Sequence, residues 1–280
     1  MEYTTLNNGI KMPMLGYGVY QVTSEECERC VLDAVNAGYR LIDTAQAYGN
    51  EEAVGRAIGK CGVLRTELFI TTKVWISNGG YEKAKESIRE SLKKLQTEYI
   101  DLLLIHQPFN DYYGTYKAME EAYKEGWLRA IGVSNFYPDR LIDLCQFVEV
   151  KPAVNQVETH VFQQQKLAHG YMQKYGVQHE SWGPFAEGRN DFFSNSTLNE
   201  IGAKYGKSAA QTALRFLIQS GVVVIPKSTH KERMIENFDV FDFVLNQSDI
   251  EAIRALDEEE SLFFSHYDPA TVEMLTGLHR

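Results

Sequence analysis

Four side chains in the first part of the chain are of types that suit proton transfer to a substrate. Asp43 ends an apolar run, Tyr48 follows five residues later, and Lys73 and His106 lie near the ends of two later apolar runs. The ordinary pKa of a tyrosine is about 10, which is too high for an efficient acid near neutral pH. A lysine ammonium within about 4–6 Å would lower that pKa. We therefore expect Asp43 to orient Lys73, and Lys73 to lower the pKa of Tyr48. We expect His106 to donate a hydrogen bond to a substrate oxygen.

Each of these residues also has a purely structural explanation. His106 could be a core histidine with satisfied hydrogen bonds, Lys73 and Asp43 could form a buried ion pair, and Gln156 could tie down a loop. The functional interpretation depends on their number, because polar residues end seven of the eight strands that the sequence predicts. These residues are Asp43, Lys73, His106, Ser134 with Asn135, Gln156, Trp182, and Lys227 with Ser228.

The residue types also indicate which chemistry is absent. The array has no nucleophile next to a base, so it does not indicate acyl transfer. It has no HExxH motif and no closely spaced cluster of His, Asp and Glu, so we expect no metal. The remaining chemistry is the reduction of a carbonyl, with a proton from Tyr48 and a hydride from a cofactor.

Eight short apolar runs, separated by amphipathic stretches, must position these side chains. The candidate strands are residues 14–20, 40–44, 68–75, 100–107, 130–135, 152–158, 177–182 and 222–228. Eight strands that alternate with helices predict a (β/α)8 barrel, in which chemistry gathers at the carboxyl ends of the strands. An open doubly wound sheet is the alternative, but its GxGxxG turn is missing. An Asn-Gly turn near the start predicts a β-hairpin, which we expect to cap the bottom of the barrel.

Composition sets the broad class of the protein. The chain has 280 residues, is 44% hydrophobic and carries a formal net charge of −10. We expect a single barrel domain over residues 1–280, with 260–280 as a C-terminal tail. The acidic balance argues against nucleic acid as a partner, and no run is long enough to span a membrane. The start lacks a signal-peptide pattern, so we expect a cytoplasmic protein. Cys27 and Cys30 are expected to be reduced thiols on a helix.

A basic segment follows the eighth predicted strand. Within "IPKSTHKERMIEN" (225–237), Lys227, Lys231 and Arg233 cluster in an otherwise acidic chain. Thr229 with Glu232 fits a capping box, which predicts that a helix begins there. A helix N-terminus beside Lys and Arg suits a phosphate group, and barrels commonly bind phosphates at this position. The alternative is a solvated run of charges.

At this point the chain resembles the aldo-keto reductase family over nearly its whole length. The resemblance rests on "GYRLIDTAQAYGNE" (38–51) followed in order by "LFITTKVW", "DLLLIHQP", "IGVSN", "VNQVE" and "VIPKSTHKERMIEN". It implies a (β/α)8 barrel and a bacterial, NADPH-dependent carbonyl reductase with ordered cofactor binding. It places the catalytic residues at Asp43, Tyr48, Lys73 and His106. It places nicotinamide contacts at Ser134, Asn135 and Gln156, adenosine-phosphate contacts at Lys227, Ser228, Arg233 and Asn237, and an adenine contact at Glu236.

The chain departs from the family pattern around the substrate. Trp182 stands where a tyrosine usually stacks on nicotinamide, Gln107 replaces a frequent tryptophan, and Val161 replaces a proline. The substrate pocket is predicted to include Tyr20, Trp75, Gln107, Phe263 and Phe264. The aromatic tail, which includes Tyr267, could line that pocket or could cover the outside of the barrel.

The expected partner is a small carbonyl compound, and the chain is expected to be a monomer, with a dimer as the alternative. Two other functions fit the same features. The barrel could bind NADPH as a sensor or regulatory subunit with little turnover, or it could be an isomerase that uses the phosphate site for its substrate.

Overall fold

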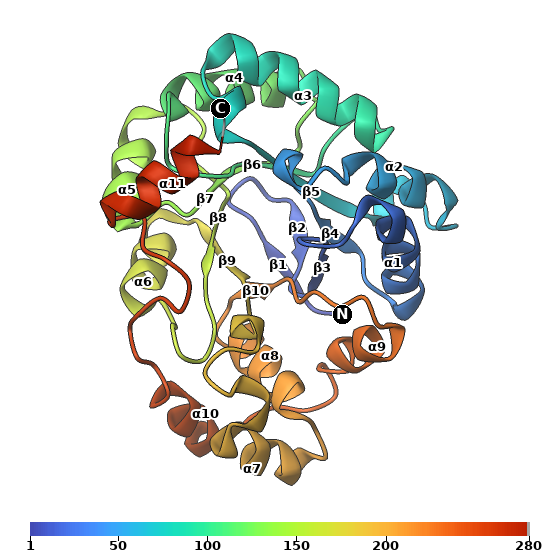
Figure 1. Cartoon of the computed structure of the whole chain (residues 1–280), viewed down its shortest axis with the longest axis vertical. Helices are drawn as coiled ribbons and strands as arrows, with labels where there is room; N and C mark the ends of the chain where they lie inside the picture. Colours follow the sequence, from blue (N-terminus) through green and yellow to red (C-terminus); the bar gives the residue numbers. More distant parts are fainter. Residues whose placement is uncertain (279–280) are drawn as a thin grey trace.

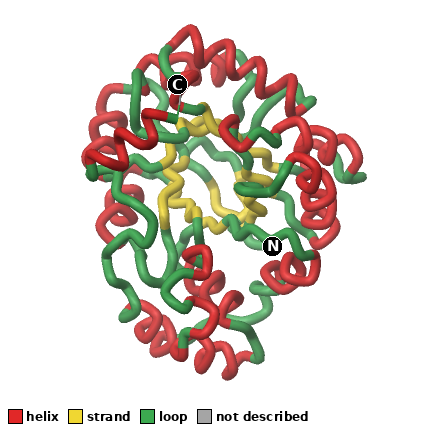
Figure 2. Tube along the Cα trace, viewed as in Figure 1, coloured by secondary structure: helices red, strands yellow, loops and turns green. Residues whose placement is uncertain are grey.

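The computed structural model describes residues 1–278, and eight parallel strands form a barrel at its centre (Figures 1 and 2). Consecutive strands along the chain are neighbours in the sheet. The first and last strands meet through a bridge between Leu15 and Val224, which closes the barrel. The predicted (β/α)8 architecture is therefore confirmed. The strands are β3 (Gly16–Gly18), β4 (Leu41–Asp43), β5 (Phe69–Val74), β6 (Leu102–Ile105), β7 (Ile131–Ser134), β8 (Val154–Glu158), β9 (Gln178–Trp182) and β10 (Val223–Val224).

The strands read as continuous apolar runs because both of their faces are covered. All four residues of β6 are buried, between the barrel interior and the surrounding helices. The seam between the first and last strands requires a glycine. A Cβ atom on Gly18 would lie 2.9 Å from the carbonyl oxygen of Ile225, so only glycine fits there without a shift of the backbone.

Helices surround the strands on all sides (Figure 2). Their ends follow local signals: α1 begins after Thr23, whose side chain accepts from the Glu26 amide, and stops at Gly38, whose φ is 114°. Among residues 1–278, no helix combines the length and the apolar character needed to cross a membrane. The helices are α1 (Ser24–Ala37), α2 (Glu51–Lys60), α3 (Tyr81–Leu95), α4 (Tyr112–Lys124), α5 (Pro138–Phe147), α6 (Lys166–Tyr175), α7 (Ser196–Tyr205), α8 (Ala209–Gln219), α9 (Lys231–Phe238), α10 (Gln247–Arg254) and α11 (Pro269–Gly277).

The N-terminal hairpin lies at the amino ends of the strands. Its strands β1 (Tyr3–Thr5) and β2 (Lys11–Pro13) pair in antiparallel fashion. The side chains of Asn7 and Asn8 donate to the carbonyl oxygens of Pro152 and Arg129, which precede β8 and β7. The hairpin therefore caps the bottom of the barrel, as predicted, and leaves the carboxyl ends of the strands for the site.

The C-terminal segment returns to the carboxyl ends of the strands. After α10 it runs past α6, and α11 then lies beside α5 (Figure 1). Tyr267, which is 63% exposed, donates a hydrogen bond to Asp139 at the start of α5. The last two residues of the predicted tail, 279 and 280, lie outside the described residues.

Candidate active site

Three adjacent strands bring the four predicted proton-transfer residues together. Asp43 is the last residue of β4, Lys73 lies in β5, and His106 directly follows β6. Tyr48 ends the short 3₁₀ helix η1 (Gln46–Tyr48) in the loop after β4. Because the three strands are parallel neighbours, their carboxyl ends lie side by side and the side chains converge.

Lys73 is the centre of this group. Its side chain is fully buried, and its Nζ lies 2.5 Å from Asp43 Oδ1. Nζ also donates to the Thr44 carbonyl oxygen at 3.0 Å and to the Tyr48 hydroxyl at 3.3 Å. The ammonium thus donates its three hydrogen bonds to one carboxylate, one carbonyl and one phenol. These contacts fix its position before any ligand binds.

The pKa of Tyr48 differs from the expectation. Burial of the hydroxyl raises this pKa to about 12, and the charge of Lys73 lowers it only in part. The prediction that lysine would bring the pKa below its usual value is therefore wrong for the free protein, because the loss of water around the hydroxyl outweighs the nearby cation. The phenol is protonated at neutral pH, as a proton donor must be. Burial alone would lower the pKa of Lys73. The nearby Asp43 and Tyr48 outweigh this effect, so the pKa is raised above its usual value and Lys73 stays charged.

His106 is held against Tyr48 and is neutral. Its ring makes an edge contact with the Tyr48 ring at 5.6 Å and with the Trp75 ring at 5.0 Å between centroids. Burial, and then the charge of Lys73, place the pKa of His106 well below its usual value. Its buried Nδ1 has no hydrogen-bond partner within residues 1–278. A neutral imidazole keeps one N–H as a donor, which suits a contact with a substrate oxygen.

The predicted nicotinamide-binding residues adjoin the four predicted proton-transfer residues and are already hydrogen-bonded to one another. Ser134 donates to the Gln156 carbonyl oxygen, and Asn135 donates to the His106 carbonyl oxygen at 3.0 Å. Asn135 has a φ of 62°, in the left-handed region that asparagine tolerates better than most residues. Its Oδ1 accepts from the Trp182 indole at 2.9 Å. These contacts join the ends of β7, β8 and β9 into one polar surface.

Gln156 connects this surface to Asp43 across the barrel. Its Nε2 donates to Asp43 Oδ2 at 2.9 Å and to Glu180 Oε2 at 3.0 Å. Glu180, in the middle of β9, was not predicted as a site residue. The sequence feature that could have indicated Glu180 is its acidic side chain inside an apparent core strand, "VQHESW".

The basic segment differs from the buried rim. Lys227 and Arg233 are exposed, and within residues 1–278 neither makes an ion pair or a side-chain hydrogen bond. Arg29, on α1, lies next to this segment and donates weakly to the Thr229 carbonyl oxygen. Two free cations beside a helix start fit the phosphate of a nucleotide.

The local structure of this segment corrects one prediction. The helix α9 begins at Lys231 after His230, and no side chain caps it, so the expected Thr229–Glu232 capping box is wrong. Ser228 takes the role of the local acceptor, because its Oγ accepts from the His230 amide at 3.1 Å. Glu236 is exposed and accepts from the Ser208 hydroxyl at 2.6 Å, whereas Asn237 is buried.

The tail is fixed across the ends of β8 and β9. Glu158, the last residue of β8, accepts from the Ser261 hydroxyl at 2.5 Å and from the Leu262 amide at 3.0 Å. Phe263 then lies edge-on to Trp182, with 5.1 Å between ring centroids, and Phe264 is stacked on Trp182 at 6.2 Å. Phe263 and Phe264 therefore lie over the strand ends, whereas Tyr267 lies on the outside of the barrel, against the start of α5.

A polar contact links the tail to the residue after His106. His266 Nε2 lies 2.6 Å from Gln107 Oε1, and burial lowers the pKa of His266 to about 4, so the ring is neutral. Nε2 must carry the proton, because an amide oxygen only accepts. Two more of the predicted pocket residues lie beside Tyr48 and His106. The ring centroids of Tyr20 and Tyr48 are 5.0 Å apart, and the Trp75 ring contacts the His106 ring.

Comparisons with known proteins fit this geometry. Residues 12–258 match the model of the aldo/keto reductase family. The chain belongs to the aldo/keto reductase family. A curated relative, glyoxal reductase of Bacillus subtilis, is 47% identical over 257 residues, which are 91% of this chain and 92% of the relative. Membership identifies the chain as an NADP-dependent oxidoreductase.

Two solved structures of aldo-keto reductases superpose closely on this reductase. One, from a Medee basin deep-sea metagenome library, has a TM-score of 0.93 at 42% identity and covers 95% of this chain and 98% of its own. The other, from the silkworm Bombyx mori, was solved in complex with NADP. It has a TM-score of 0.88 at 34% identity and covers 92% of this chain and 94% of its own.

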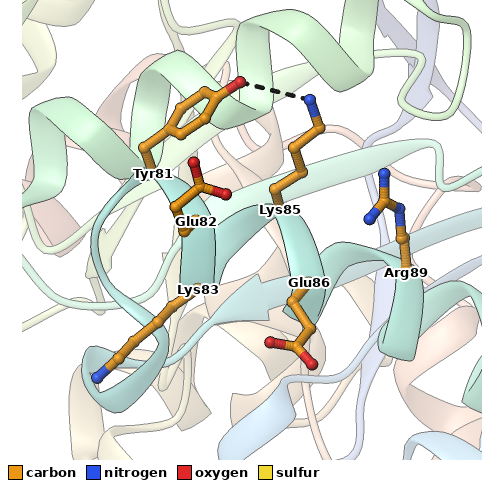
Figure 3. Close-up of a pocket in the computed structure, with 6 residues that line it drawn as sticks. All are labelled: Tyr81, Glu82, Lys83, Lys85, Glu86 and Arg89. Atoms are coloured by element: carbon orange, nitrogen blue, oxygen red, sulfur yellow. Dashed lines mark hydrogen bonds between the residues drawn. The ribbon is translucent and has the colours of Figure 1, made fainter.

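A hollow on the outside of the reductase lies apart from these residues. Figure 3 shows its lining, which comes entirely from one stretch of α3: Tyr81, Glu82, Lys83, Lys85, Glu86 and Arg89. Acidic and basic residues are interspersed along this stretch, and Lys85 pairs with Glu121 of the neighbouring α4. This surface is a solvated helix face, and none of the predicted site residues contributes to it.

Proposed function

We propose that this reductase converts small aldehydes or ketones to alcohols with NADPH, and that 1,2-dicarbonyl compounds are its preferred substrates. The observation that carries the proposal is the contact between the Tyr48 hydroxyl and Lys73 Nζ, 3.3 Å apart, with Lys73 held by Asp43. It combines a protonated phenol, a fixed positive charge and a neutral imidazole at one rim of a barrel. The name of the glyoxal reductase relative supports the dicarbonyl part of the proposal.

The roles of the side chains follow from their contacts. NADPH, when bound, supplies the hydride. Tyr48 donates its proton to the carbonyl oxygen as negative charge develops there, which is general acid catalysis. Lys73 favours that transfer, because its charge stabilises the phenolate that the transfer leaves behind. Asp43 keeps Lys73 charged and in place. His106 donates a hydrogen bond to the same substrate oxygen and thereby orients the carbonyl.

The cofactor residues fall into two groups. Ser134, Asn135 and Gln156 hold the amide of the nicotinamide, and the Trp182 ring stacks on it. Phosphate and adenosine contacts come from the basic segment after β10. Exposed Lys227 and Arg233 suit the 2′-phosphate that distinguishes NADPH from NADH. The residues assigned to this second group are Lys227, Ser228, Arg233, Glu236 and Asn237.

The substrate pocket is assigned to the open side of Tyr48 and His106. Tyr20, Trp75 and Gln107 form its walls, and the tail adds Phe263 and Phe264. Gln107 favours a polar substrate such as a dicarbonyl, because its amide places a donor beside His106, where a second substrate oxygen can bind. In this proposal residues 1–280 act as one domain, whose tail 260–280 lines the pocket, and the protein works in the cytoplasm as a monomer.

A panel of carbonyl compounds tests the proposal. The loss of NADPH absorbance is followed with methylglyoxal, a simple aldehyde, a keto sugar and a cyclic ketone, each over a range of concentrations. We expect turnover with at least the first two, and the largest kcat/KM with methylglyoxal. Tight binding of NADPH without oxidation by any of the four would favour a sensor. Thermal protection by a sugar phosphate but not by NADPH would favour an isomerase.

A further inference from the structure

Glu180 is a second carboxyl group in the interior of the barrel, close to the catalytic rim. It lies in β9, opposite Gln156 of β8 and Val223 of β10, and its side chain is fully buried. The Gln156 amide nitrogen lies between Glu180 Oε2, at 3.0 Å, and Asp43 Oδ2, at 2.9 Å. Both hydrogens of that amide are therefore used by carboxyl groups, and the side-chain oxygen of Gln156, Oε1, is left free in the described part of the chain.

The charges around Glu180 do not balance if it is ionised. The charged groups that face it are Asp43 on β4 and Lys73 on β5, whereas β8 and β10 offer Gln156 and Val223. Lys73 already pairs with Asp43 at 2.5 Å. Glu180 Oε1 has no hydrogen-bond partner within residues 1–278. An ionised Glu180 would be a buried negative charge without a cation of its own, which is costly.

We propose that Glu180 is a positioning residue that is a neutral carboxyl at neutral pH. Its Oε2 accepts from the Gln156 amide, so that the side-chain oxygen of Gln156 is available to the cofactor, and its neutral state leaves Asp43 as the single negative partner of Lys73. This inference rests on the proposed reduction with NADPH. It adds to that function a titratable group that touches neither substrate nor cofactor.

The ionisation of Glu180 should slow carbonyl reduction. Burial, followed by the charge of Asp43, raises the pKa of Glu180 to about 8. Above that pH, a second negative charge appears beside Lys73. It opposes the transfer of a proton from Tyr48, because the phenolate that forms is stabilised less. Tyr48 itself, with a pKa of about 12, remains protonated throughout this range.

The first experiment is a pH profile of kcat between pH 6 and pH 10 for the wild type, for Glu180→Gln and for the control Glu86→Gln. NADPH and the best carbonyl substrate are saturating, and each protein is normalised to its own kcat at pH 6. Glu86 is exposed on α3 and lines the outer hollow, to which no predicted site residue contributes (Figure 3). We expect wild-type and Glu86→Gln kcat to fall roughly fivefold to tenfold between pH 7 and pH 9, as a group with a pKa of about 8 ionises. Glu180→Gln should show no such fall. A fall of the same size in Glu180→Gln would overturn the proposal, because a merely structural role lowers kcat equally at every pH.

A second experiment does not depend on turnover. The pKa of Glu180 is higher in the folded protein than in the unfolded chain. Between these two pKa values folding must therefore keep this carboxyl protonated, and the resulting loss of stability is absent below about pH 4.5 and complete above about pH 8. The Tm of Glu180→Gln minus that of the wild type should therefore grow by a few degrees between pH 5 and pH 9. A constant difference would overturn the proposal.

These outcomes separate the two proposals. If the wild type reduces no carbonyl, the proposed function fails, while the Tm difference still tests the protonation of Glu180. If Glu180→Gln does not fold, infrared spectroscopy of the wild type replaces it. We then expect a carboxylic acid C=O band that disappears as the pH rises through about 8, and the absence of that band would contradict the inference.

Discussion

The proposed catalytic rim, around Lys73 and Asp43, and the basic segment after β10 differ in how much of their geometry the chain fixes by itself. At the rim, Lys73 and Asp43 are almost fully buried; the Lys73 ammonium donates three hydrogen bonds and the Asp43 carboxylate accepts two. In the basic segment, Lys227 and Arg233 are exposed and have no charged partner within residues 1–278. The side chains proposed for proton transfer are thus positioned in advance by parallel strands, while the proposed phosphate contacts are left to form with the ligand.

This difference predicts different responses to mutation and to salt. A buried ion pair with fixed geometry is strongly coupled to folding, and removing one partner leaves an uncompensated charge. Exposed cations cost little to remove, and salt screens their interaction with a phosphate. Changes at the rim should therefore affect turnover and stability together, whereas changes in the basic segment should affect cofactor affinity alone.

The largest effect is expected from Lys73→Met. The substitution leaves Asp43 buried without its ammonium partner and removes the charge that stabilises the Tyr48 phenolate. We expect a loss of about 3–5 kcal/mol in the free energy of unfolding. We also expect kcat to fall by at least about a hundredfold. Urea denaturation and steady-state kinetics measure the two effects.

The double variant Asp43→Asn with Lys73→Met is the matched control. It removes both charges, so it should regain a large part of the stability that Lys73→Met loses, while turnover stays low. If the double variant is no more stable than Lys73→Met, the ion pair does not stabilise the rim as we describe.

A smaller effect is expected from Arg233→Ala. The 2′-phosphate should lose a charge-assisted hydrogen bond worth about 1.5–3 kcal/mol, reduced by solvent at this exposed position. We expect the Kd for NADPH to rise about tenfold and the Kd for NADH to change little. Fluorescence titrations with both cofactors at low and high salt measure this, and the preference for NADPH should shrink as salt rises.

Lys83→Ala removes a comparable exposed cation from the outer face of α3 and is the control for net charge (Figure 3). Its affinity for both cofactors should equal that of the wild type. An equal loss of NADH and NADPH affinity in Arg233→Ala would show that Arg233 does not contact the 2′-phosphate.

The smallest effect is expected in the tail, from Ser261→Ala. The Ser261 hydroxyl donates to Glu158 and accepts from the amides of Phe263 and Phe264, so its loss loosens the aromatic residues above Trp182. We expect KM for the carbonyl substrate to rise roughly twofold to fivefold, with kcat nearly unchanged. Ser248→Ala, on the distant helix α10, is the control. Wild-type KM in Ser261→Ala would indicate that the tail does not line the pocket.

Much of the fold could be predicted from the sequence because buried parallel strands leave clear local signals. All eight predicted strands occur, and helices lie between consecutive strands from β3 to β10. The observed strands are shorter than predicted. The run 222–228 contains only β10, since Pro226 has no amide hydrogen to continue the ladder.

Contacts between distant segments could not be predicted in the same way. Gln156 links Glu180 to Asp43 through the barrel interior, and His266 meets Gln107 across 159 positions of the chain. Neither pair has a local pattern. The net pKa of Tyr48 also depends on how deeply its hydroxyl is buried, which residue types alone do not reveal. The capping box predicted from Thr229 and Glu232 does not form, because Ser228 forms the turn that precedes α9.

The proton-donor role of Tyr48 is tested most directly by Tyr48→Phe, which keeps the ring and removes the acid. The measurement combines kcat for the best carbonyl substrate with the Kd for NADPH, in the variant and in the wild type. We predict that kcat falls by at least about a hundredfold, the lower range for general acid catalysis, while the Kd for NADPH stays within about twofold. Turnover close to that of the wild type, with NADPH bound equally well, would contradict the account.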